Sequence, residues 1–121
     1  AQAAYPAQSA QSARATILVL ATRATLQSGA YLRAIRRVAP RATIEQVACP
    51  LFVPMIEEGI LRGPLNRAIL DHYLRPYKLR HGVALLGCTH YPWIARAIQK
   101  ALPKMKVVNS ASSVAAQVRE L

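Results

Sequence analysis

The sequence predicts an α/β fold built around a parallel sheet. Short apolar segments alternate along the chain with segments in which apolar residues recur at helical spacing, as in consecutive strand–helix units. One apolar run, Val83-Ala84-Leu85-Leu86, has no polar residue at alternate positions. Such a run suits a strand that is buried on both faces, which is typical of parallel sheets covered by helices.

The first half of the chain is expected to supply two strands and one helix. Residues 16–20 form a β-branched apolar run, and residues 43–48 are expected to form a second strand. Between them, Ser28 could cap a helix that continues to about residue 39 and is ended by Pro40. Residues 1–15 consist largely of Ala, Gln and Ser, and we expect them to be a flexible or helical lead-in.

The second half is expected to continue the alternation of helices and strands. Pro64 and Pro92 each fit the first turn of a helix, where a missing backbone N–H costs nothing. The residue before Pro76 resists the helical region, so a helix should end there. The expected elements are a short helix at 54–59, a helix from 64 to near 76, a strand at 82–86, a helix at 92–102, a strand at 106–108 and a helix at 111–120.

The charge of the chain is strongly positive. Sixteen Lys and Arg residues against five acidic ones give a net charge of +11, an excess that often indicates polyanionic partners. However, Arg33, Arg36, Arg37 and Arg41 have the spacing of a solvent-facing helix side, so we expect them to aid solubility and attract an anionic substrate. A nucleic-acid module would interleave aromatic and basic residues. With one Phe and one Trp, this chain does not show that pattern.

Composition also limits which cellular compartments and which cofactors are expected. The 121 residues suffice for one modest core, and no stretch approaches the ~20 consecutive apolar residues of a membrane span. We expect no signal peptide, and two distant cysteines favour reduced thiols in the cytoplasm. His72 and His81 lack partners at metal-ligand spacing, and no glycine-rich phosphate loop is present. We therefore predict neither a metal site nor a nucleotide cofactor.

The residues with the most evident chemistry follow the apolar run at 82–86. Cys88, Thr89 and His90 are consecutive, and a helix is expected to start at Pro92. The three side chains therefore lie in a strand-to-helix turn at the carboxyl end of a strand, which is the usual ligand crevice of an open α/β sheet. A helix start there would favour a bound carboxylate and a thiolate over a thiol.

Each residue of this turn also has a structural interpretation. Cys88 could be a small buried core residue. His90 could cap its helix or pack against Tyr91, but beside a cysteine it can also polarise a substrate or shuttle a proton. Thr89 could satisfy helix N–H groups or hold a substrate carboxylate. We predict catalytic roles for Cys88 and His90, and substrate binding for Thr89 and His90.

Candidate residues also follow the other expected strands. Thr22 and Thr25 lie at another strand end, where N-capping and carboxylate binding are equally reasonable. Glu57 is either an exposed helix carboxylate or a catalytic residue. Cys49, which precedes Pro50, is expected to be structural. We predict substrate binding for Thr22 and Thr25 and a catalytic role for Glu57.

Three ordered motifs resemble those of one enzyme family. The string GCTHYP at residues 87–92 resembles the second catalytic-cysteine motif of the bacterial glutamate racemases. Residues 20–31, LATRATLQSGAY, are similar to that family's LATxxTxxSxxY segment, and residues 48–57, ACPLFVPMIE, to its aCPxfVPlvE segment. Residues 107–110 resemble the final strand and its loop. The resemblance covers roughly residues 14–121.

The resemblance implies a three-layer domain of the aspartate/glutamate racemase type that is the carboxy-terminal half of a two-domain enzyme. Residues 16–110 would form the second α/β domain. Residues 111–121 would form a terminal helix that packs on the first domain. The family's Asp-Ser loop and its first catalytic cysteine, in a Cys-Asn-Thr context, have no counterpart in this chain.

The resemblance further implies a cofactor-independent, two-base exchange of L- and D-glutamate for peptidoglycan synthesis. Cys88 would be one base, and a cysteine of the absent half would be the other, because Cys49 is not in the matching motif. A cysteine suits both duties, since its thiol and thiolate forms are both accessible near neutral pH. We expect this chain to be inactive by itself, and the complete enzyme to be a homodimer.

Two alternatives remain at this point. The first is an aspartate racemase-like enzyme, although the Thr-His pair after the cysteine favours glutamate. The second is a non-catalytic basic domain that contacts nucleic acid or a DNA-handling protein. Binding to phosphates weakens steeply with ionic strength, whereas glutamate turnover should change little, so salt dependence discriminates between them.

Overall fold

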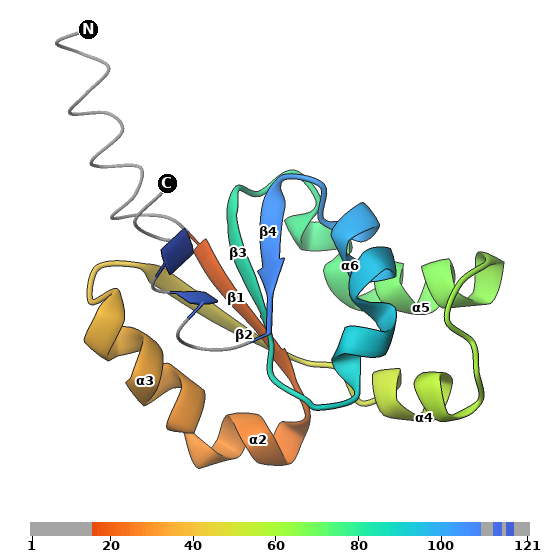
Figure 1. The fold of residues 1–121 in the computed structure, drawn as a ribbon, viewed down its shortest axis with the longest axis horizontal. Coiled ribbons are helices and arrows are strands. Elements are labelled where there is room, and N and C mark those ends of the chain that lie inside the picture. The colour runs from red at the N-terminus through yellow and green to blue at the C-terminus, as the bar shows by residue number, and fades with distance from the viewer. Residues whose placement is uncertain (1–15, 110–112, 115, 118–121) are drawn as a thin grey trace, which may run out of the picture.

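The computed structural model describes residues 16–109, 113–114 and 116–117, which form a parallel sheet with helices on both faces (Figure 1). The four strands lie in the order β2-β1-β3-β4. In chain order, the elements are β1 (Thr16–Ala21), α2 (Arg23–Ser28), α3 (Ala30–Val38), β2 (Thr43–Ala48), α4 (Phe52–Glu57), α5 (Pro64–Leu74), the 3₁₀ helix η1 (Arg75–Tyr77), β3 (Gly82–Leu86), the 3₁₀ helix η2 (Tyr91–Ile94), α6 (Ala95–Ala101) and β4 (Met105–Val108).

The two central strands are buried along their whole length. Every residue of β1 and β3 is buried, whereas the edge strands β2 and β4 are partly exposed. Ile17 of β1 pairs with Ile44 of β2 on one side and with Val83 of β3 on the other. All three strand pairs are parallel, which explains why residues 82–86 form a continuous apolar run instead of an alternating one.

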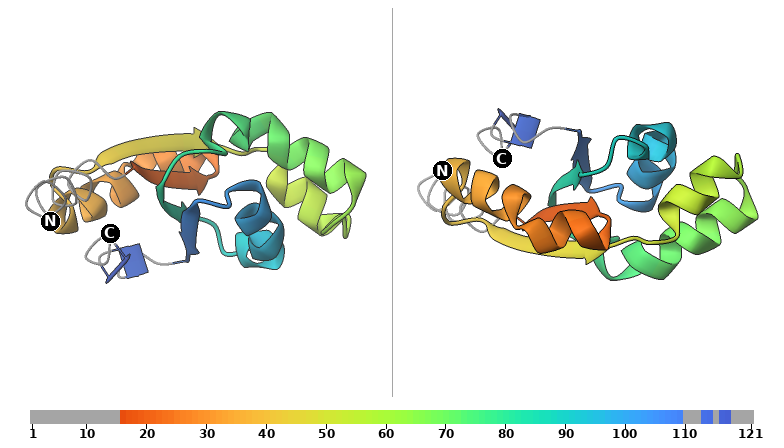
Figure 2. Two further views of the ribbon diagram at one scale, coloured as in Figure 1. Left: turned by 90° about the horizontal axis from the view of Figure 1, so that it is seen from above. Right: turned by 90° about the horizontal axis from the view of Figure 1, so that it is seen from below.

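Side chains of the central strands alternate between two apolar clusters, one on each face of the sheet. The first cluster joins Leu18 and Leu20 of β1 to α4, α5 and α6. The second joins Ile17 and Val19 to Ile35 of α3. Figure 2 shows the strands between α3 and the group formed by α4, α5 and α6. The three-layer arrangement that the sequence predicted is therefore confirmed.

Most predicted elements are confirmed, but the segment after β1 was predicted wrongly. A separate helix, α2, precedes α3, because the side chain of Thr22 accepts the N–H of Thr25 and caps it. Gly29 then adopts a left-handed conformation with φ of 72° and separates the two helices. Ser28, which was expected to cap one long helix, ends α2, and its hydroxyl accepts the N–H of Ala30 at 3.3 Å.

Smaller differences concern helix starts. The helix expected at 54–59 begins at Phe52, so Pro54 lies inside its first turn. The helix expected at 92–102 begins as η2, and α6 follows it only from Ala95. The lead-in at 1–15 lies outside the described residues. Of the helix expected at 111–120, only residues 113–114 and 116–117 are described, and they are helical.

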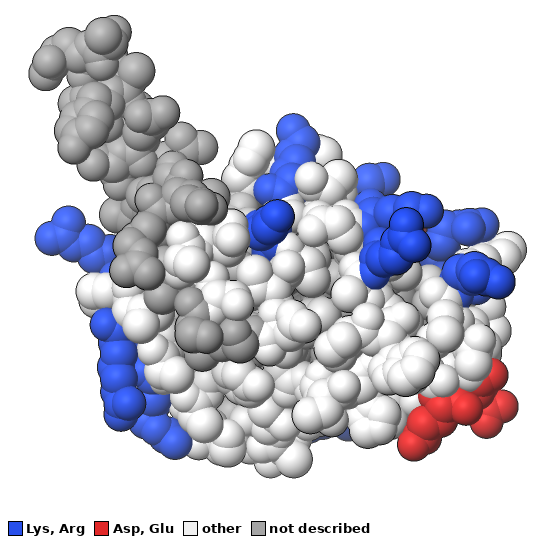
Figure 3. Space-filling view, in the orientation of Figure 1, with Lys and Arg blue, Asp and Glu red and all other residues white. Residues whose placement is uncertain are grey.

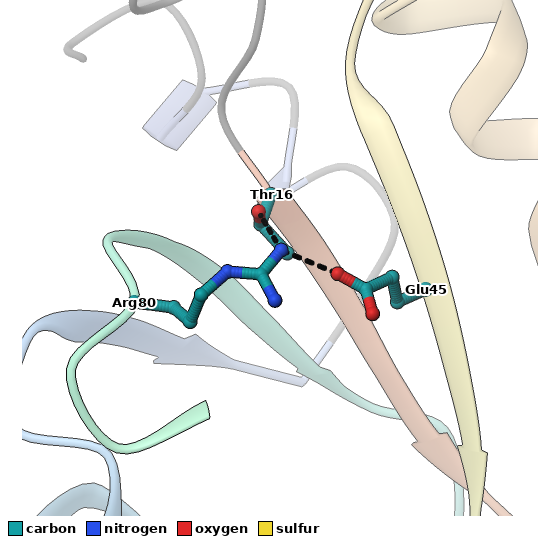
Figure 4. Close-up of polar contacts among 3 residues, drawn as sticks. All are labelled: Thr16, Glu45 and Arg80. Carbon is teal, nitrogen blue, oxygen red and sulfur yellow. Dashed lines mark hydrogen bonds and ion pairs between the residues drawn. The ribbon is translucent and has the colours of Figure 1, made fainter. Parts of the chain in front are cut away.

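The amino edge of the sheet is held by a polar contact between three segments. The guanidinium of Arg80 donates to the Thr16 hydroxyl at 2.8 Å and forms an ion pair with Glu45 of β2 (Figure 4). Gly82 lies two residues after Arg80, and a Cβ atom there would lie 2.0 Å from the carbonyl oxygen of Thr16. The start of β3 therefore needs glycine, and Arg80 ties that start to β1 and β2.

Candidate active site

The carboxyl ends of β1, β2 and β3 meet at one edge of the sheet. Two backbone hydrogen bonds continue the ladder beyond the strands: Cys49 N–H donates to Ala21 at 2.9 Å, and Gly87 N–H donates to Leu20 at 2.7 Å. The residues that follow the strands are therefore held side by side at this edge. This is the position at which open α/β sheets bind ligands.

The turn after β3 carries the predicted cysteine and histidine. Cys88 is half-buried, and its Sγ lies 3.8 Å from Nδ1 of His90. Thr89 and His90 are exposed. The backbone N–H of Tyr91 donates to the Cys88 carbonyl at 3.1 Å and closes the turn. The structure thus brings together a reachable thiol and an imidazole, which can exchange a proton or hold one near a substrate.

The helix that follows this turn does not start where the sequence predicted. The first turn after His90 is the 3₁₀ helix η2, with Pro92 near its beginning. The α-helical part, α6, begins at Ala95 and is seven residues long. The partial positive charge of a helix start acts within about one turn, and α6 begins beyond that distance in sequence from Cys88. The side chains of the turn therefore supply its chemistry.

The turn after β2 carries the second cysteine, in a different environment. Cys49 is fully buried, and burial raises the pKa of its thiol from 9.0 to about 12. Its Sγ lies 3.6 Å from the carbonyl oxygen of Val47. A thiol that stays protonated inside the core has little nucleophilic or basic capacity near neutral pH. This geometry agrees with the structural role expected for Cys49.

The segment after β1 holds the two candidate threonines. Thr22 and Thr25 are both half-buried, and their hydroxyl oxygens lie 2.9 Å apart. Thr22 also accepts the backbone N–H of Thr25 at 3.3 Å, which makes it the N-cap of α2. Both hydroxyls lie just beyond the carboxyl end of β1, next to the ends of β2 and β3. Capping uses one lone pair of the Thr22 oxygen and leaves its second lone pair available.

Glu57 is the last residue of α4 and is exposed. Helix α4 packs against η2, the segment that continues the Cys88 turn. The structure therefore brings the helix that carries Glu57 to the same edge of the sheet. It does not place Glu57 in a hydrogen bond or ion pair with Cys88, Thr89 or His90.

Two packing features of this edge were not predicted from the sequence. A Cβ atom on Gly87 would lie 3.0 Å from the Cβ of Ala21 and 3.2 Å from a ring carbon of Tyr31. Tyr31 of α3 therefore packs against the backbone just before Cys88. Tyr91 is fully buried and contacts the Cys49 turn. In the sequence, Gly87 could have indicated the close approach of Tyr31. Residue spacing gives no indication that Tyr91 contacts the Cys49 turn.

The described surface has separated charged regions. Figure 3 shows Lys and Arg side chains in groups on opposite sides of the molecule, and acidic side chains gathered near the α4 end. No group of three or more His, Cys, Asp or Glu side chains that could hold a metal ion occurs among the described residues. Within that same part of the chain, no helix has both the length and the apolar character that a membrane crossing requires.

These features define a parallel α/β domain with a thiol–imidazole pair at the carboxyl edge of its sheet. No family model matches the chain. It is 39% identical over 102 residues to the glutamate racemase of Aquifex aeolicus (strain VF5), covering 84% of this chain and 39% of that protein. It is 43% identical over 102 residues to the glutamate racemase of Gloeobacter violaceus (strain ATCC 29082 / PCC 7421), covering 83% of this chain and 38% of that protein.

Solved structures agree with this similarity. The glutamate racemase of Francisella tularensis subsp. tularensis SCHU S4, in complex with D-glutamate, matches with a TM-score of 0.72 at 32% identity, over 93% of this chain and 43% of that one. The Campylobacter jejuni subsp. jejuni enzyme matches with a TM-score of 0.73 at 28% identity, over 97% and 46%. By sequence and fold, the chain is homologous to part of the glutamate racemases. It spans about two fifths of the length of the curated relatives it matches.

Proposed function

We propose that this chain is part of a cofactor-independent glutamate racemase, in which Cys88 serves one face of the substrate. The observation that supports this most is the Cys88–His90 pair, with Sγ and Nδ1 3.8 Å apart at the carboxyl edge of the sheet. The same edge belongs to a fold whose solved relatives include a glutamate racemase bound to D-glutamate. A parallel α/β sheet alone would not indicate an activity.

The proposed chemistry inverts the α-carbon of glutamate through two proton transfers. In one direction, the Cys88 thiolate removes the α-proton from one face, and an acid on the opposite face delivers another proton to the carbanionic intermediate. In the reverse direction, the Cys88 thiol donates its proton. We propose that the opposite group comes from the remaining part of the enzyme, because Cys49, the second cysteine of this chain, is buried in the core with the pKa of its thiol raised to about 12.

Binding of glutamate requires donors for its carboxylates. The exposed Thr89 and His90 and the half-buried Thr22 and Thr25 lie on segments that leave this one edge, and we propose that they contact the substrate. His90 would also exchange a proton with Cys88 or stabilise the charge that develops on the substrate. We propose an auxiliary catalytic role for Glu57, supported by the contact between α4 and η2.

The partner of this chain would be the remaining part of the enzyme. Apolar side chains are exposed on the segments that flank the crevice: Leu51 after β2 is 46% exposed, and Trp93 in η2 is 69% exposed. Contact with a further domain would cover such side chains and close the crevice to water. We further propose that the complete enzyme is a cytoplasmic homodimer that supplies D-glutamate for peptidoglycan, and thereby for cell wall biogenesis and cell shape.

The proposed function is tested by adding the part of a related racemase that would supply the opposite face of the active site. The purified 121-residue chain should form no D-glutamate from L-glutamate, because it supplies groups to one face only. Co-expression with the complementary part of a related glutamate racemase should restore D-glutamate formation, followed by circular dichroism. Restored turnover of aspartate in place of glutamate would contradict the substrate assignment. Racemisation by the chain alone would contradict the two-base scheme.

A further inference from the structure

The turn at residues 49–51 is held from two sides by aromatic side chains. The Tyr91 hydroxyl donates to the Cys49 carbonyl at 3.4 Å, and the Tyr73 hydroxyl accepts the N–H of Leu51 at 3.1 Å. Phe52 lies between the two tyrosines, edge to face with both, at ring-centroid distances of 5.3 Å. Edge-to-face pairs at this separation are attractive, so the three rings and the turn form one packed unit.

Tyr91 connects two strands that do not pair with each other. The strand order places β1 between β2 and β3, so no ladder hydrogen bond joins the end of β2 to the end of β3. The Tyr91 backbone N–H closes the Cys88 turn, and its side chain reaches across the end of β1 to the Cys49 carbonyl. One residue therefore links the half-buried Cys88 thiol to the turn after β2.

The Tyr91 link is buried and stays a hydrogen-bond donor over a wide pH range. The tyrosine is fully buried. Burial, and to a smaller extent the neighbouring Cys49, Cys88 and Tyr73, raises the pKa of its phenol well above 10.0. The neutral hydroxyl therefore persists at any pH at which the enzyme would work. Removal of the hydroxyl leaves the Cys49 carbonyl with the Phe52 N–H at 3.0 Å as its donor, and the Cys88 turn loses its hydrogen bond to the Cys49 turn while the ring contact with Phe52 remains.

We propose that Tyr91 is a positioning residue, which fixes the Cys88 turn relative to β2 and α4. The proposal rests on the function proposed above only where it concerns turnover. Tyr73 offers a matched comparison, since its hydroxyl binds the same 49–51 turn from the α5 side, and its described hydrogen bond goes to Leu51 and not to the Cys88 turn. A general loss of packing would follow from either substitution, whereas a loss of Cys88 positioning should follow only from Tyr91→Phe.

The first test uses the chain as it is and needs no racemase activity. Cys88 alkylation by iodoacetamide is followed by mass spectrometry in the wild type, Tyr91→Phe and Tyr73→Phe, with thermal unfolding measured alongside. Tyr91→Phe should speed alkylation about threefold or more, because one lost hydrogen bond permits that much additional local opening. Tyr73→Phe should leave the rate unchanged even where it lowers the unfolding temperature.

Equal alkylation rates in Tyr91→Phe and wild type would overturn the proposal, as would equal acceleration by both substitutions. Phe52→Leu provides a second variant: it removes the ring that supports Tyr91 and keeps both hydroxyls. It should accelerate Cys88 alkylation less than Tyr91→Phe does. Greater acceleration by Phe52→Leu than by Tyr91→Phe would also contradict a role for the hydroxyl.

The second test separates this proposal from the proposed function. In the complemented racemase, Tyr91→Phe should lower kcat about tenfold and leave KM nearly unchanged, because the thiol is misplaced and the substrate contacts remain. A tenfold rise in KM with unchanged kcat would contradict the proposal that Tyr91 positions Cys88. If the complemented wild type forms no D-glutamate, the racemase proposal fails, while the alkylation rates still decide whether Tyr91 positions Cys88.

Discussion

The two cysteines of this chain occupy equivalent places in the fold and differ in almost every chemical respect. Each follows a parallel strand at the same edge of the sheet, Cys49 after β2 and Cys88 after β3. Cys49 is fully buried beneath α4, with the pKa of its thiol raised to about 12. Cys88 is half-buried, with the His90 imidazole 3.8 Å from its sulfur.

The comparison shows that sheet topology places both cysteines at the same edge, and that local packing decides which of the two thiols is accessible. After β2, the chain turns into α4, and Phe52 and Met55 complete the cluster that encloses Cys49. After β3, which ends at Leu86, four residues separate the strand from η2, and Thr89 and His90 are exposed. A thiol needs access and a proton partner to act as a base. Only the β3 turn combines the two.

The largest expected difference between the cysteines is in alkylation. In the folded chain at pH 8, iodoacetamide should modify Cys49 at least about a thousandfold more slowly than Cys88, because a thiol of pKa about 12 is thiolate in only about one molecule in ten thousand. Peptide mass spectrometry at timed intervals measures both rates. Unfolding in urea should abolish the difference. Equal alkylation rates of Cys49 and Cys88 in the folded chain would contradict the proposed difference between the two cysteines.

Buried Cys49 should also make the fold sensitive to alkali. Its folded pKa, about 12, lies above the unfolded value of 9.0. The associated stability is therefore present below pH 9 and is lost as the pH rises towards 12. The loss is at most about 4 kcal/mol, from ~1.4 kcal/mol per pKa unit.

Urea unfolding between pH 7 and 11 tests this prediction by comparing the wild type with Cys49→Ala. The variant should lose less stability than the wild type over the same interval. Burial, the largest cause of the raised pKa values of Tyr91 and Tyr77, remains in both proteins. Cys49 also raises both pKa values to a smaller extent, and the loss of this effect in Cys49→Ala acts in the same direction as the loss of the thiol. Identical pH dependence in the two proteins would show that the Cys49 thiol does not titrate as proposed.

His90→Asn should sharpen the assignment of Cys88 to one face of the substrate. In the complemented enzyme, kcat should fall by about a hundredfold from one enantiomer and much less from the other. The ratio kcat/KM must fall equally in both directions, because the equilibrium between enantiomers is fixed at unity. Initial rates from L- and D-glutamate measure this. Equal losses of kcat from both enantiomers would indicate a structural histidine.

The strands were predictable from short apolar or β-branched runs, and the pattern is plainest in β1 and β3, which are buried along their whole length. Residues 43–48 and 82–86 were predicted with the bounds that the structure shows, and 16–20 with one residue fewer. Helix α2 was missed, because Thr22 and Thr25 were considered as a possible cap without the six-residue helix that such a cap begins. Strand order was not predictable, since each parallel connection could lead to either side of the preceding strand.

The site was predictable as a turn but not as a packed unit. Cys88, Thr89 and His90 are adjacent in sequence, so their proximity required no long-range information. The link between Tyr91 and the Cys49 carbonyl spans 42 positions and depends on the strand order. The GCTHYP string predicts the chemistry of this turn, whereas the contacts of Tyr91 with the Cys49 turn became visible only in the three-dimensional structure.

The smallest expected effect is at the opposite edge of the sheet. Arg80→Ala removes the hydrogen bond to Thr16 and the ion pair with Glu45. Because the side chains of Arg80 and Glu45 are partly exposed, the loss should cost at most about 1 kcal/mol of unfolding free energy. Because this contact lies at the amino ends of the strands, Cys88 alkylation should keep its wild-type rate. An altered alkylation rate in Arg80→Ala would show that the two edges are coupled.

The central claim, that Cys88 is a base and Cys49 is not, is tested most directly by racemisation in two alanine variants. In the complemented enzyme, D-glutamate formation from L-glutamate is followed by circular dichroism for Cys88→Ala and Cys49→Ala. Cys88→Ala should lower kcat by about a thousandfold, within the range for loss of a general acid–base group. Cys49→Ala should keep nearly wild-type turnover below its unfolding temperature. Substantial turnover by Cys88→Ala, or an equal loss in Cys49→Ala, would contradict the claim.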